Sequence, residues 1–199
     1  MINLPLSKSV ERKERINRID MNLILLQKKS VNIKEFIDFW SKFYMDPNEK
    51  KYSENINKTK FDKHTLLSLF EWKNGSKLSK RKMKSFEIKI LAKLKIINSL
   101  KASSDFRLNE FLAEFKDLSI IWKIFLLHII RPNEYPVFDQ HVYRAFYYIK
   151  HFPNIMELPN DNERKEKCYF KEYLPFLIRL KKGSQLKNAM RLYGLLANF

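Results

Sequence analysis

Cysteine and glycine are scarce in this chain of 199 residues, which has one cysteine and three glycines. The single Cys168 excludes an internal disulfide bond and a cluster of thiolate ligands. The four histidines lack the spacing from carboxylates that zinc enzymes use, so we expect no metal site. Three glycines are also too few for the glycine-rich phosphate loops of nucleotide-binding proteins. We therefore expect a protein that works without a metal or another cofactor.

Long apolar runs are missing too. The chain has no run of about 18 apolar residues, the length that a membrane-spanning helix needs. Residues 1–8 lack the apolar centre of a signal peptide. These absences favour a cytoplasmic protein without a membrane partner. The 199 residues, of which 45% are hydrophobic, suffice for a single helical domain over 1–199, or for two lobes that share one core.

Positive charge far exceeds negative charge. Lysine and arginine number 39 against 22 acidic residues, which gives a formal net charge of +17. A charge of this size attracts polyanions and favours nucleic acid as the partner. Lysine, asparagine and isoleucine are abundant together, however, as they are in proteomes encoded by AT-rich genomes. Codon composition is therefore an alternative origin for part of this charge.

Apolar residues recur at intervals of three and four along most of the chain, which predicts an almost wholly helical protein of about eight helices. A helix is expected at 63–73, ending at the cap signal Asn74-Gly75, and a long amphipathic helix from Ser79 to Lys101. Residues 119–130 are apolar nearly all round, which predicts a central buried helix. Residues 47–62 are polar and predict a mobile connection. The other helices are expected at 9–29, 32–45, 105–116, 139–151, 163–182 and 184–198.

The segment from His128 to Phe146 departs from this generic helical pattern. Pro132 and Pro136 lie four residues apart and force an extended turn, because each fixes its own φ and biases the residue before it. Asp139 then begins a new helix as its N-cap. The helix dipole favours the ionised form of a carboxyl group there. Such a carboxylate is either a cap alone or a catalytic group as well.

The sequence Val137-Phe138-Asp139-Gln140-His141-Val142-Tyr143-Arg144-Ala145-Phe146 resembles the segment that carries the catalytic aspartate in the helix-hairpin-helix DNA glycosylases. This superfamily includes the endonuclease III, adenine glycosylase and 8-oxoguanine glycosylase branches. Asp139, Val142 and Arg144 match its pattern in order. The resemblance implies a two-lobed all-α fold with Asp139 at the mouth of a cleft. It also implies a monofunctional glycosylase that hydrolyses the N-glycosidic bond of a damaged or modified base, extruded from double-stranded DNA, with Asp139 as the catalytic carboxylate.

The hairpin of that superfamily is altered here. It is normally Leu-Pro-Gly-Val-Gly about 20 residues before the aspartate, and its glycines let backbone amides approach a phosphate. This chain has Leu118-Ser119-Ile120-Ile121-Trp122-Lys123 instead, so the hairpin is rebuilt or lost. Lys123 is the nearest candidate for the Schiff-base lysine of bifunctional members, but its spacing from Asp139 is about half a turn short. Phosphate contact or solvation is the alternative for Lys123, and the lack of a well-placed lysine argues against a lyase step.

Two further functions remain open on the sequence. The missing hairpin glycines favour a non-catalytic nucleic-acid-binding protein that retains a glycosylase-like fold. The high positive charge also suits a helical module that binds acidic protein partners. Binding to DNA at low salt distinguishes these two alternatives, because low salt strongly promotes the binding of polyanions.

Aromatic and basic residues complete the predicted site. Base stacking is predicted for Tyr135, Phe138, Tyr143 and Trp72, with packing in the core as the alternative for each. His128 lies on an apolar helix and is expected to be a buried imidazole with its hydrogen bonds satisfied. Phosphate contacts, or else a solvated charged face, are predicted for Lys80, Arg81, Lys84, Arg131, His141, Arg144, Lys181, Lys182 and Lys187.

Overall fold

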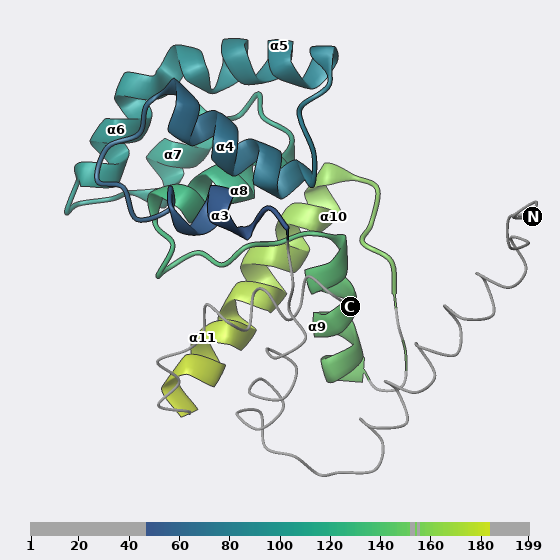
Figure 1. The fold of residues 1–199 in the computed structure, drawn as a ribbon. Helices are drawn as coiled ribbons and strands as arrows, with labels where there is room; N and C mark the ends of the chain where they lie inside the picture. The colour runs from purple at the N-terminus through teal and green to yellow at the C-terminus, as the bar shows by residue number, and fades with distance from the viewer. Residues whose placement is uncertain (1–46, 152–153, 155, 184–199) are drawn as a thin grey trace, which may run out of the picture. The chain divides into compact units, whose positions relative to one another are not determined.

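The computed structural model describes residues 47–151, 154 and 156–183, all of which belong to one compact unit, Trp40–Phe199. Every regular element in these residues is a helix, which confirms the predicted all-α class (Figure 1). None of the helices described is both long and apolar enough to cross a membrane. The helices expected at 9–29, 32–45 and 184–198 lie outside the described residues.

The end of α4 and the start of α5 lie where the sequence signals them. Asp62 caps α4 by accepting a hydrogen bond from the amide of Thr65, and Gly75 ends this helix with a φ of 71°, a left-handed conformation that favours glycine. Ser79 caps α5 in the same way as Asp62 caps α4. In chain order the elements are α3 (Glu49–Ser53), α4 (Lys63–Asn74), α5 (Lys80–Lys89), the 3-10 turn η2 (Leu91–Lys93), α6 (Leu94–Ala102), α7 (Leu108–Glu114), α8 (Ile120–Ile130), α9 (Gln140–His151), α10 (Asn162–Lys167), the π-helical turn η3 (Cys168–Tyr173) and α11 (Leu174–Gly183).

Helix α8 lies at the centre of the hydrophobic core, as its apolar sequence predicts. All residues from Ile124 to Ile130 are buried. The ring of Phe125 meets that of Phe70 in α4 edge to face at 5.1 Å, and Phe70 in turn contacts the ring of Phe86 in α5 at 5.5 Å. Burial of such a side chain contributes roughly 1.5–3 kcal/mol. This aromatic contact therefore fixes α4 and α5 against α8.

The long helix predicted from Ser79 to Lys101 is broken in the structure. Ile90 is fully buried with φ −119° and ψ −60°, and the 3-10 turn η2 follows it before α6 begins. A straight helix over this span would be roughly 35 Å long at 1.5 Å per residue, longer than a small core can cover on one side. The break lets Phe86 before it and Ile97 after it both reach the core. Tertiary packing thus overrides a continuous helical pattern.

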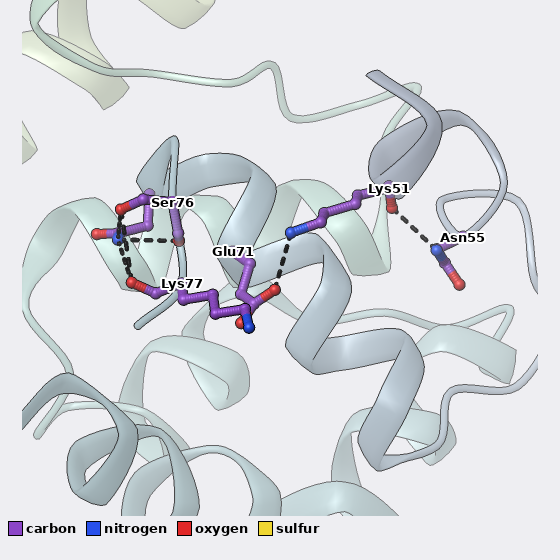
Figure 2. Close-up of polar contacts among 6 residues, drawn as sticks. Lys51, Asn55, Glu71, Ser76 and Lys77 are labelled. Atoms are coloured by element: carbon purple, nitrogen blue, oxygen red, sulfur yellow. Dashed lines mark hydrogen bonds and ion pairs between the residues drawn. The ribbon is translucent and has the colours of Figure 1, made fainter. Parts of the chain in front are cut away.

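The segment 47–62, predicted to be a mobile connection, is part of the packed structure. It contains α3, and its Ile56 and Phe61 are buried in the core cluster. The backbone amide and carbonyl of Phe61 both bond to the side chain of Asn98 in α6, at 2.7 and 2.9 Å. Lys51 also forms an ion pair of 2.9 Å with Glu71 in α4 (Figure 2). The polar residues of this segment therefore make specific contacts instead of forming a flexible link.

The C-terminal helices pack against α9 through aromatic rings. Phe138 and Phe146 contact the ring of Tyr173 at 5.3 and 5.5 Å, and Tyr173 is fully buried. Tyr173 ends the π-helical turn η3, and Pro175 follows two residues later as the second residue of α11. Proline has no amide hydrogen, and its ring clashes with the carbonyl of the residue four places earlier. The wider π turn accommodates this proline within an otherwise continuous helical segment.

Lys101 ties α6 to α8 without an acidic partner. Its ammonium group donates to the carbonyls of Ile129 at 2.9 Å and Ile56 at 3.4 Å, and lies 4.3 Å from the centre of the Phe61 ring. Burial, and then the charge of Arg131, lower the pKa of Lys101 from 10.5 to about 8. In the folded protein the ammonium group of Lys101 thus lies among carbonyl oxygens and against an aromatic face.

The stability of the protein is expected to increase with pH through the titration of Lys101. Below about pH 8 the folded and unfolded chains both hold this proton, and the cost of burying the charge is fully present; between pH 8 and 10.5 only the unfolded chain holds it. The free energy of unfolding should therefore rise over this range relative to that of Lys101→Met. Denaturant titrations at several pH values measure this difference. Lys95→Met, a change at an exposed lysine of the same helix, should show no such trend.

Candidate functional site

The chain before Asp139 is held in place by two buried hydrogen bonds to consecutive carbonyl groups. Nδ1 of His128 donates to the carbonyl of Tyr135 at 2.7 Å, and the hydroxyl of Tyr169 donates to the carbonyl of Pro136 at 2.9 Å. Nε2 of the same ring is hydrogen-bonded to the hydroxyl of Tyr52 at 2.8 Å, so both ring nitrogens have partners. This confirms the buried, satisfied imidazole predicted for His128. These bonds therefore fix the extended turn, and with it the position of Asp139.

Asp139 caps α9, as predicted, and also forms an ion pair that the sequence did not indicate. Its Oδ1 accepts from the amide of Val142 at 2.9 Å, and its carbonyl accepts from the amide of Tyr143 at 2.9 Å. Its Oδ2 lies 2.6 Å from Nζ of Lys73, in the last turn of α4. The side chain of Lys73 is only 9% exposed and that of Asp139 is 22% exposed. Both carboxylate oxygens thus have partners, and the group still reaches the surface.

The surroundings of Asp139 keep its carboxyl group charged. Burial is the largest influence and by itself raises the pKa. The positive charge and hydrogen bond of Lys73, together with the amide of Val142 and a smaller effect of His141, outweigh burial and leave the pKa of Asp139 below its usual value. The carboxylate is therefore ionised at neutral pH, as its N-cap position predicted.

The pairing of Lys73 with Asp139 could not be predicted from the sequence, for a physical reason. It lies 66 residues before Asp139, and a lysine in the last turn of a helix is ordinarily explained by the helix dipole. Lys123, the lysine nearest to Asp139 in the expected region, is half-buried and makes no hydrogen bond or ion pair with Asp139. The tertiary fold therefore supplies a lysine beside the aspartate, although local spacing does not.

The turn after α4 connects the Asp139 site to a group of basic residues. Asn74, next to Lys73, donates from its side-chain amide to the carbonyls of Ser76 and Lys77 and to the hydroxyl of Ser76, at 3.1–3.4 Å (Figure 2). Its Oδ1 accepts from the ammonium group of Lys82. The turn is thereby fixed. Lys77 in the turn and four residues of the following helix α5 are exposed cations, and together we call them the basic corner: Lys77, Lys80, Arg81, Lys82 and Lys84.

None of the five cations of the basic corner forms an ion pair with a carboxylate in the part of the chain that the structure describes. Glu87 is the one acidic residue of α5, and it lies 4.0 Å from Lys63. The corner therefore presents uncompensated positive charge. It includes Lys80, Arg81 and Lys84, which the sequence analysis predicted to contact phosphates.

The other predicted phosphate contacts have varied surroundings. Arg131 donates to the carbonyl of Ser103 and lies 5.1 Å from the centre of the Phe106 ring. Arg144 forms two hydrogen bonds of 2.8 and 2.9 Å with Glu157. These two arginines thus already have partners, whereas His141 is exposed in the first turn of α9. Only the backbone of Lys181 and Lys182, in α11, is described, and Lys187 lies outside the described residues.

The predicted stacking residues are mostly packed in the interior. Phe138 has no exposed surface, and Tyr143 is 4% exposed, so neither ring offers a face to a base in this structure. Tyr135 is half-buried against the ring of Phe106 at 6.0 Å. Trp72 is half-buried, with its ring 4.3 Å from that of Tyr52. Core packing, the alternative in the sequence analysis, accounts for Phe138 and Tyr143.

A helix–turn–helix unit occupies the position of the expected hairpin. Helices α7 and α8 are joined by residues 115–119, and Gly75 is the only described residue with a positive φ. The turn is built on hydrogen bonds such as that from the amide of Leu118 to the carbonyl of Phe115, at 3.1 Å. Its carbonyl groups at Glu114 and Asp117 accept from lysines of η2 and α5. The segment in which the hairpin was expected therefore forms a turn without glycine between two helices.

No three side chains of histidine, cysteine, aspartate or glutamate gather closely enough to hold a metal ion in the ranges that the structure covers. The candidate site consists of the Lys73–Asp139 ion pair, the α4–α5 turn and the basic corner.

The ion pair between Lys73 and Asp139 is expected to contribute to stability. Asp139→Asn keeps a side chain that can cap α9 but leaves the ammonium of Lys73 buried without its partner. We expect a coupling energy of about 1–3 kcal/mol in a double-mutant cycle with Lys73→Met, measured by denaturant unfolding. The exposed pair of Asp105 and Arg107 is the control and should give about 0.5 kcal/mol or less. Equal values for the two pairs would contradict this expectation.

Comparisons of this chain with known proteins found no match. No family model matches the chain, and no curated protein or solved structure is similar enough to it to count as a match. The resemblance to the helix-hairpin-helix glycosylases consequently depends on the segment around Asp139, with Asp139, Val142 and Arg144 in matching order.

Proposed function

We propose that this protein binds DNA through the basic corner and hydrolyses an N-glycosidic bond with Asp139 as the catalytic carboxylate. The observation that carries the proposal is the geometry of Asp139. Its carboxylate is ionised, fixed by an amide and an ammonium group, and partly exposed, and its partner Lys73 stands at the end of α4, next to the turn that leads to the basic corner. The substrate class is duplex DNA with a damaged or modified base.

The chemistry requires a fixed negative charge beside the sugar. As the bond to the base breaks, positive charge develops on the deoxyribose ring, and a preorganised carboxylate stabilises it without the cost of reorientation. Asp139 meets this requirement, because its cap to Val142 holds the side chain in one orientation. The extruded base would be held by residues near the surface, since Phe138 and Tyr143 are buried.

A second candidate function is DNA binding without chemistry. Two observations favour it. The α7–α8 turn directs carbonyl groups to lysines of the same protein, and the charge of Asp139 is partly neutralised by Lys73. A protein with this site would retain the binding surface and release no base from any substrate.

Removal of the basic corner should reduce the salt dependence of DNA binding. Replacement of Lys80, Arg81 and Lys84 by glutamine removes three charges, and each phosphate contact contributes about 0.9 to the slope of log K against log salt. The slope should therefore become shallower by about 2.7 when binding is measured from ~50 to ~200 mM salt. Lys95, Lys116 and Lys167 are exposed and do not belong to the basic corner, and their replacement by glutamine is the control of equal charge. An equal loss in both variants would attribute binding to net charge alone.

Base release should depend on the charge of Asp139. Purified protein is incubated with duplexes that carry a panel of modified bases, and abasic sites are then cleaved with alkali. We expect Asp139→Asn to lose at least about 100-fold in rate on the best substrate, since one preorganised electrostatic group contributes this much. Circular dichroism at the assay temperature verifies that the variant is folded. Activity equal to wild type in a folded Asp139→Asn protein excludes the catalytic role, and no release by wild type leaves the binding function.

A further inference from the structure

We propose that Lys73 is the positioning residue of the Asp139 site, holding the aspartate through Oδ2 while Oδ1 caps α9. The inference rests on the proposed function, because it assigns a second residue to the same site. Lys73 comes from α4, a helix that the sequence analysis did not associate with Asp139. The site is thus assembled from two helices, the C-terminal end of α4 and the N-terminal end of α9.

The direction of the Lys73 side chain is the first argument. A lysine in the last turn of a helix is favourably placed to bond the free carbonyl groups of its own helix. Lys73 instead reaches another element and ends 2.6 Å from Oδ2 of Asp139, with 9% of its side chain exposed. Burial of an ammonium group is costly, and only a well-oriented partner compensates for it. The contact is therefore specific to Asp139.

The arrangement of bonds around the carboxylate is the second argument. Oδ1 is held by the amide of Val142 at 2.9 Å and Oδ2 by Lys73 at 2.6 Å. Loss of the cap alone or of the lysine alone would leave the carboxylate held through one oxygen, and the whole group could then turn about that bond. Two bonds from two helices fix both the position and the plane of the carboxylate. A fixed orientation is what a group needs to act on developing charge without reorganisation.

The matched ion pair on the same helix shows what is particular to Lys73. Lys51 and Glu71 also pair at 2.9 Å, but Lys51 is 34% exposed and Glu71 caps no helix (Figure 2). That pair joins α3 to α4 and lies outside the Asp139 site. Lys51→Met is therefore a control that breaks an ion pair of α4 and leaves Asp139 untouched.

The experiment is a pH titration of Asp139 by NMR, with aspartate labelled at the carboxyl carbon, in wild type, Lys73→Met, Lys73→Arg and Lys51→Met. The charged groups that act on Asp139 are Lys73 from α4 and His141 from α9, and burial opposes them. With Lys73 removed, burial dominates, and we expect the pKa of Asp139 to rise by at least about one unit. Lys73→Arg should restore the wild-type titration, and Lys51→Met should leave it unchanged. An unchanged titration in Lys73→Met overturns the proposal.

A measurement on the wild-type protein covers the case in which Lys73→Met does not fold. The side-chain nitrogen signal of Lys73 should shift together with the carboxyl signal of Asp139 through the same titration, and independent titrations overturn the proposal.

Base release separates this proposal from the proposed function. Wild type that releases no base refutes the catalytic function, while the titration still decides the role of Lys73. Reductive trapping of a covalent adduct between Lys73 and DNA by borohydride would show an amine nucleophile and overturn a positioning role.

Discussion

The ion pair between Lys73 and Asp139 is the contact on which the candidate site depends. It joins residues 66 positions apart and brings together the end of α4 and the start of α9. Without it, a carboxyl group that is largely buried would have only the amide of Val142 and the smaller effect of His141 to offset its loss of water. The pair therefore explains how Asp139 is both ionised and immobile. It also links Asp139 to α4, the helix that leads through the next turn to the basic corner.

The ion pair can form because the backbone around it is fixed by uncharged contacts. His128 and Tyr169 hold the two carbonyl groups of Tyr135 and Pro136, and both side chains are fully buried. On the side of α4, the aromatic contacts with Phe125 fix the helix against α8. The polar site is thus supported by an apolar and aromatic framework. This support is what permits a charged pair to lie so close to the core.

Local features of the fold were predictable from the sequence, and long-range ones were not. The cap of α4 at Gly75, the start of α5 at Ser79 and the cap of α9 at Asp139 each follow from the chemistry of one residue and its neighbours. The break at Ile90 and the role of Lys73 follow from packing between distant segments, which no local pattern records. The sequence left both core packing and base stacking open for Phe138, because an aromatic ring at helical spacing is compatible with both. In the structure Phe138 is packed in the core.

The basic start of α5 has a consequence for how the protein responds to its surroundings. Lys80, Arg81 and Lys82 occupy the first turn of this helix, where the helix dipole is positive and acidic residues are favoured. Each such cation costs about 0.3–1 kcal/mol at low ionic strength. The electrostatic energy of the first turn of α5 is consequently unfavourable whenever no anion is near it. A polyanion bound there would offset this unfavourable energy, and binding would then stabilise the first turn of the same helix that supplies the three cations.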